Sequence, residues 1–119
     1  GVEELKLPMM LPFYQKMSVT DDEMLIMFSS KRFSELQTLN LRRCGNITDA
    51  SVSKVTRGCS NLQSLNLYEC NNITGASLAA VGVLCSYLQS LDLRQCFSIT
   101  SVDKNVLRKL HPKLTIRDD

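Results

Sequence analysis

The sequence predicts an α/β solenoid of about four repeats, with a curved parallel sheet inside and helices outside. A 26-residue block recurs, because residues 36–61 and 62–87 are identical at 14 of 26 positions and residues 88–113 keep the same framework. Each block joins a short segment with leucine at alternate positions to a longer segment with helical spacing. A fixed period of this kind indicates strand–helix units stacked one on the next.

We expect a single domain over residues 1–119. Within it, residues 1–35 form an irregular N-terminal repeat or cap, the three blocks named above form regular repeats, and residues 114–119 form the C-terminal end. The 14 basic and 12 acidic residues are interspersed and leave a net charge of +2. Nucleic acid is therefore an unlikely partner, with RNA kept as a weaker alternative. No apolar run is long enough to predict membrane insertion.

The first strand is expected within residues 2–7, whose spacing matches residues 36–41. Pro8 and Pro12 exclude a regular helix or a central strand after it. This segment is expected to be a loop that covers the first edge of the sheet. The alternative is an apolar docking loop for a neighbouring chain. Its residues would be Met9, Met10, Leu11, Phe13 and Tyr14.

A helix is predicted from about Asp21 to Ser29. Thr20 and Glu23 have the spacing of a capping box, in which each side chain accepts a hydrogen bond from a free amide at the helix start. Phe33 lies 26 residues before Cys59, so this helix closes a first repeat of the same design.

The three regular copies each predict a strand, a turn with cysteine, a threonine cap and a helix. Leu39 and Leu41, with their equivalents in later copies, should point inward. Strands joined by a helix must run parallel. Thr48, Thr74 and Thr100 should cap the helices.

The last copy departs from this pattern. Lys104 stands where earlier copies have Val52 and Leu78, and Leu114 and Ile116 could form a fifth, shortened strand. A polar residue at a core position predicts the end of the array. Residues 117–119 are expected to be a solvated tail.

The cysteines recur at two repeat positions that are expected to be buried. We predict reduced core thiols in an intracellular protein of the cytoplasm or nucleus. Cys59, Cys85 and His111 share one position and raise the possibility of a zinc site. Phe33 at the same position argues against it, and no metal or cofactor is expected. The five thiols are Cys44, Cys59, Cys70, Cys85 and Cys96.

These blocks resemble the cysteine-containing subclass of leucine-rich repeats. The block that begins at Leu36, LQTLNLRRCGNITDASVSKVTRGCSNL, matches the subclass pattern at every defining position. The resemblance implies a leucine-rich-repeat solenoid that acts as a non-catalytic protein–protein interaction module. It also implies substrate recognition in an F-box-type ubiquitin ligase as a possible role. Because the subclass also occurs without a ligase role, the alternative is a structural or scaffold subunit of a large multiprotein complex.

Outward-facing positions of successive strands should form columns on the concave face. One column contains Arg42, Tyr68 and Arg94, a combination enriched where proteins bind proteins. A solvated polar face remains the alternative. Asp49 is expected to be structural at a helix start, and no set of acid, base and nucleophile predicts an enzyme. The candidate partner-binding residues are Arg42, Arg43, Tyr68, Glu69, Asp92 and Arg94.

Overall fold

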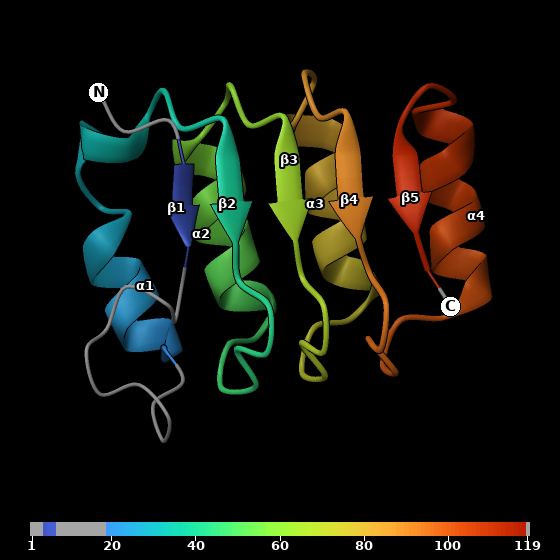
Figure 1. Cartoon of the computed structure of the whole chain (residues 1–119), viewed down its shortest axis with the longest axis horizontal. Helices are drawn as coiled ribbons and strands as arrows, with labels where there is room; N and C mark the ends of the chain where they lie inside the picture. Colours follow the sequence, from blue (N-terminus) through green and yellow to red (C-terminus); the bar gives the residue numbers. More distant parts are fainter. Residues whose placement is uncertain (1–3, 7–18, 119) are drawn as a thin grey trace.

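The computed structural model describes residues 4–6 and 19–118, and these form one parallel sheet in the order β1-β2-β3-β4-β5 with helices on one side (Figure 1). The predicted α/β leucine-rich-repeat solenoid is confirmed. The elements in chain order are β1 (Glu4–Lys6), α1 (Asp21–Met27), the 3-10 helix η2 (Lys31–Phe33), β2 (Thr38–Asn40), α2 (Asp49–Gly58), β3 (Ser64–Asn66), α3 (Gly75–Leu84), β4 (Ser90–Asp92), α4 (Ser101–Leu110) and β5 (Thr115–Arg117).

Strands β2, β3 and β4 are in the register that the 26-residue period predicts, and the step from β4 to β5 is one residue shorter. Leu39 pairs with Leu65, Leu65 with Leu91, and Leu91 with Ile116 of the predicted fifth strand. The three leucines are at most 2% exposed, so they fill the core between sheet and helices. Their neighbours in the strands face away from the helices, on a surface that we call the open face of the sheet.

The predicted helix caps are confirmed. Thr20 and Glu23 form the capping box of α1, and Thr48, Thr74 and Thr100 are the N-caps of α2, α3 and α4. Helix α1 ends two residues earlier than predicted, at Met27. Phe28 leaves the helical conformation (φ −98°, ψ 11°) because the chain turns there into η2.

Asp49 is the first residue of α2, and its side chain also caps α3, the helix of the next repeat. Its carboxylate accepts hydrogen bonds from the Thr74 backbone N–H at 2.9 Å, the Thr74 hydroxyl at 2.6 Å and the Ser77 hydroxyl at 2.5 Å. Asp21 makes the same three contacts with Thr48 and Ser51. The structural role expected for Asp49 therefore extends across the boundary between repeats.

This capping of one helix by an aspartate of the preceding helix does not continue between α3 and α4. Gly75 stands at the position of Asp49, and Asp103 of α4 caps its own N-cap residue, Thr100, in a second capping box. A Cβ atom added at Gly75 would overlap the Asp103 carboxyl group. The glycine thus leaves room for an acid that comes from the following helix instead of the preceding one.

Gly75→Asp is expected to lower the free energy of unfolding by about 1–2 kcal/mol, because it displaces the Asp103 cap and puts two carboxylates together. Asp103→Ser added to it should restore at least half of that loss, because Ser77 is the native partner of Asp49 at the equivalent position. Urea unfolding of the two variants measures both effects. A double variant that is no more stable than Gly75→Asp alone would contradict the proposed exchange of caps.

The cysteines are free and buried, as predicted. One set also links neighbouring repeats: the Cys70 thiol donates to the Leu41 carbonyl at 3.1 Å and the Cys96 thiol donates to the Leu67 carbonyl at 2.9 Å. Burial raises the pKa of Cys44, which shares the repeat position of Cys70 and Cys96, to about 11. It does the same for Cys59 and Cys85 at the other repeat position. These thiols stay protonated at neutral pH and are poor nucleophiles.

The C-terminal segment was predicted to be a solvated tail, and Arg117 and Asp118 are indeed exposed, but they are not a free tail. Arg117 is the last residue of β5. The Asp118 carboxylate lies 2.9 Å from the Arg108 guanidinium and 3.6 Å from the Lys104 ammonium group. Lys104 therefore occupies the repeat's core position with its charge paired at the end of the sheet.

Candidate functional site

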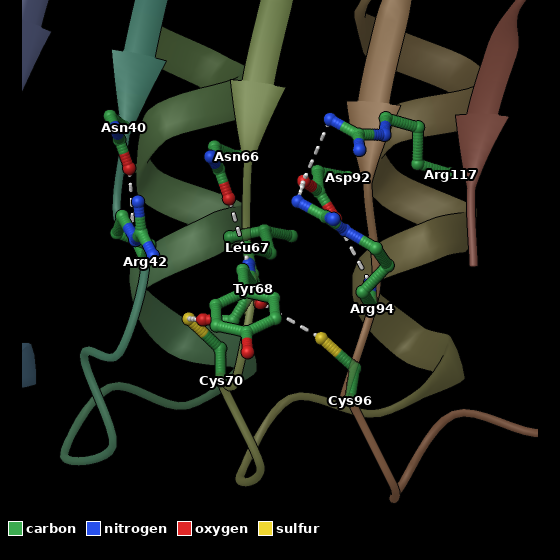
Figure 2. A network of polar contacts seen from close by, with 10 residues as sticks. All are labelled: Asn40, Arg42, Asn66, Leu67, Tyr68, Cys70, Asp92, Arg94, Cys96 and Arg117. Carbon is green, nitrogen blue, oxygen red and sulfur yellow. Dashed lines mark hydrogen bonds and ion pairs between the residues drawn. The ribbon is translucent and has the colours of Figure 1, made fainter. Parts of the chain in front are cut away.

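Three strand ends place Arg42, Tyr68 and Arg94 side by side on the open face (Figure 2). The Arg42 guanidinium carbon lies 5.3 Å from the centre of the Tyr68 ring, and that of Arg94 lies 5.2 Å away. Arg43 is 5.7 Å from the same ring. Guanidinium groups at these distances are attracted to the face of an aromatic ring, so the column predicted from the period is a packed cluster.

The backbone at each strand end follows one pattern. The side-chain oxygen of Asn40 accepts the Arg42 backbone N–H at 3.0 Å, and Asn66 does the same for Tyr68. Asp92 takes this role for Arg94 at 3.1 Å. Such side-chain turns end the strands and direct the following residue outward. Of these three acceptors only Asp92 was predicted as a site residue from the sequence, and this backbone role was not predicted for any of them.

The residue after each member of the cluster has a left-handed backbone. The φ angles are 62° at Arg43, 58° at Glu69 and 63° at Gln95. Residues other than glycine rarely adopt this conformation, and here it is repeated at one position of the period. The Arg43 guanidinium lies 3.6 Å from the Glu69 carboxylate, which joins two further predicted site residues.

Asp92 is the buried charge of the site, at 7% exposure. Arg94 binds its carboxylate with two hydrogen bonds, Nε to Oδ1 at 3.0 Å and Nη2 to Oδ2 at 2.8 Å. Burial raises the pKa of Asp92, but the Arg94 hydrogen bonds and the charges of Arg94 and Arg117 outweigh it and lower the pKa below 3.8. The carboxylate is therefore ionised at neutral pH and fixes the Arg94 side chain.

Arg117 is the site residue that sequence reasoning missed, since it was assigned to the tail. Its guanidinium lies 3.9 Å from the Asp92 carboxylate, on the side opposite Arg94 (Figure 2). The register pairs Asp92 with Arg117. The sequence contained a signal for this position. Ile116 points inward in the predicted fifth strand, as Leu91 does in the fourth, so the residue after it, Arg117, lies beside Asp92 on the open face.

The candidate docking loop of Met9, Met10, Leu11, Phe13 and Tyr14 lies outside the described residues. Among the residues that are described, no group of three or more His, Cys, Asp or Glu side chains is arranged to hold a metal ion. His111, considered for zinc, instead contacts the Gly82 carbonyl through Nε2 at 2.7 Å.

The fold agrees with the family comparison. A family model described as Leucine Rich repeat matches residues 35–55, which span β2 and most of α2. The chain therefore has leucine-rich-repeat character, and repeats of this class generally serve as non-enzymatic interaction modules. A search of curated proteins found no match. None of the helices within the described residues is long and apolar enough to cross a membrane.

Proposed function

We propose that the chain is a non-catalytic protein-binding module and that the open face binds its partner through Arg42, Tyr68 and Arg94. The observation that carries this proposal is the stack of guanidinium groups on one tyrosine ring. Arginine and tyrosine dominate binding energy at protein interfaces because they combine large contact area with polar groups. Three side chains held against one another also lose less conformational freedom on binding than separate exposed side chains.

Replacing Arg42, Tyr68 and Arg94 together with alanine is expected to abolish partner binding while the fold is kept. Partners are captured from cell extract on the immobilised wild-type protein and on the variant, and are identified by mass spectrometry. Circular dichroism confirms that the variant is folded. A set of partners that still binds the triple variant rules out the open face as the binding surface.

A second candidate function, a structural subunit of a larger complex, is favoured by apolar side chains exposed on the helices. Val83 of α3 and Val106 and Leu110 of α4 are 54–74% exposed and line a shallow hollow between the two helices. Exposed apolar patches mark interaction sites. The matched variant changes these three residues to serine. Loss of partners from this variant, with binding kept by the open-face variant, would support the structural subunit instead.

The resemblance to the cysteine-containing subclass extends the first proposal to substrate recognition in an F-box-type ubiquitin ligase. In that role the open face would hold the protein to be modified, and an F-box segment would connect the module to the ligase. The sequence encoded upstream of Gly1 in the natural gene tests this extension. An F-box there supports it, and a full-length protein without one contradicts it.

A further inference from the structure

Arg42 and Arg94 occupy the same repeat position, two periods apart, but their neighbours two residues earlier differ. Arg94 follows Asp92, whereas Arg42 follows Asn40. Both neighbours accept the backbone N–H of their arginine, at 3.1 Å and 3.0 Å. The backbone role is therefore shared, and the difference lies in the charge next to the guanidinium.

The contacts of Arg94 show how an arginine at this repeat position binds a carboxylate. Asp92 receives two parallel hydrogen bonds from Arg94 and has Arg117 at 3.9 Å. The planar fork of a guanidinium matches the two oxygens of a carboxylate, and this pairing is one of the strongest hydrogen-bonded contacts in proteins.

At Arg42 the equivalent carboxylate is missing. The Asn40 side chain is neutral, and its oxygen is used by the Arg42 backbone. Among the described residues no Asp or Glu forms an ion pair with Arg42, whose side chain is exposed and lies over Tyr68. From β2 to β5, and in the turns that follow these strands, the open face has four arginines, Arg42, Arg43, Arg94 and Arg117, and two acids, Glu69 and Asp92.

We propose that Arg42 binds a carboxylate from an acidic peptide segment of the partner, which fills at Arg42 the place that Asp92 fills at Arg94. This inference rests on the proposed function, since it names the chemistry that the open face recognises. The surplus of positive charge attracts acidic segments and disfavours basic ones. The Tyr68 ring provides the apolar contact beside the carboxylate.

The direct probe is an acetylated and amidated octapeptide of alternating Glu and Ser, with the Gln–Ser peptide as its neutral match. Both are titrated to millimolar concentration into protein labelled with ¹⁵N, and the arginine Nε–Hε resonances are followed. The acidic peptide should shift the Arg42 resonance in a saturable way, and Arg94 should respond less because Asp92 already pairs with it. No shift at Arg42, or equal shifts with both peptides, overturns the proposal.

Two substitutions test this proposal by adding a carboxylate two residues before Arg42 or by removing the one two residues before Arg94. Asn40→Asp supplies the internal carboxylate and should weaken binding of the acidic peptide by at least about tenfold, the loss expected when a charged hydrogen-bonded pair is blocked. Asp92→Asn should strengthen binding, because it removes the carboxylate that occupies the Arg94 guanidinium in the wild type. Both keep the side-chain oxygen that ends the strand, so folding should be retained.

Thr38→Asp is the matched control for added charge. It puts the same charge on the same strand and face as Asn40→Asp, but two residues away, beyond reach of Arg42. Its effect should stay within about threefold, as for a screened surface charge. Equal losses in both variants, or Asn40→Asp binding like the wild type, overturn the proposal.

The same variants separate this inference from the proposed function. A protein partner that is lost from the triple alanine variant but kept by Asn40→Asp leaves the open face as the binding surface and refutes the carboxylate-binding role. Partners unaffected by the triple variant refute the proposed function itself.

Discussion

Leu65→Ala is expected to lower the free energy of unfolding by about 2–5 kcal/mol, through lost burial and the cavity that remains. Leu65 is 2% exposed and lies in β3, which pairs with β2 on one side and β4 on the other. Each repeat contacts only its neighbours, so a cavity in the middle of a short array weakens both interfaces at once. Urea unfolding followed by circular dichroism measures the loss.

The control for this prediction is Ser64→Ala, one residue earlier on the open face. The Ser64 hydroxyl makes a hydrogen bond with Ser90 at 3.1 Å and is not in the core. Its removal should cost less than about 1 kcal/mol, the net value of one such bond. If the two variants are equally stable, the inward register of Leu65 is incorrect.

Asp49→Ala is expected to lower the free energy of unfolding by about 2 kcal/mol, because one carboxylate satisfies the start of α3 from the preceding repeat. The change leaves the Thr74 backbone N–H and two hydroxyl groups without their acceptor. Asp22→Ala is the matched control, since Asp22 is an exposed acid in the first turn of α1. That control should change stability by less than about 0.5 kcal/mol.

The Asp49 effect should also depend on pH. Burial raises the pKa of Asp49, but hydrogen bonds from Ser77 and Thr74 outweigh it and lower the pKa below 3.8. A group with a lowered folded pKa stabilises the fold above its unfolded pKa, and this contribution is lost as pH falls through the folded value. The stability difference between wild type and Asp49→Ala should therefore be full at pH 7 and shrink below pH 3.8. A difference that is constant across this range would contradict the ionised cap.

The fold could be predicted because each repeat packs against the next in the same way, so that residues at equivalent positions of the repeat become neighbours in space. Once Leu65 is equivalent to Leu39 and Leu91, strand direction, register and inward faces follow from the period and the pleat. The same reasoning placed Arg42, Tyr68 and Arg94 in one column. The end of α1 was predicted less well, because Met27 and Phe28 both fit helical spacing and only the turn into η2 separates them.

The contacts between repeats could not be predicted in the same way. Asp49 follows a helix cap in the sequence, so its nearest amides seemed to be those of its own helix. The structure brings Thr74 and Ser77 to its carboxylate from 25 and 28 residues away. Arg117 was likewise assigned by its place near the end of the chain, although β5 puts it beside Asp92.

The amino-acid sequence by itself determined the period, the buried leucines and cysteines, the caps and the column of arginine and tyrosine, because each depends on spacing along the chain. Tertiary structure alone decided which charges are paired. The Arg117 guanidinium lies 3.9 Å from the Asp92 carboxylate, and that of Arg43 lies 3.6 Å from the Glu69 carboxylate, and both pairs join different repeats. The physical reason is that a charge pair depends on distances of a few ångströms between side chains, which stacking of the repeats sets and spacing does not.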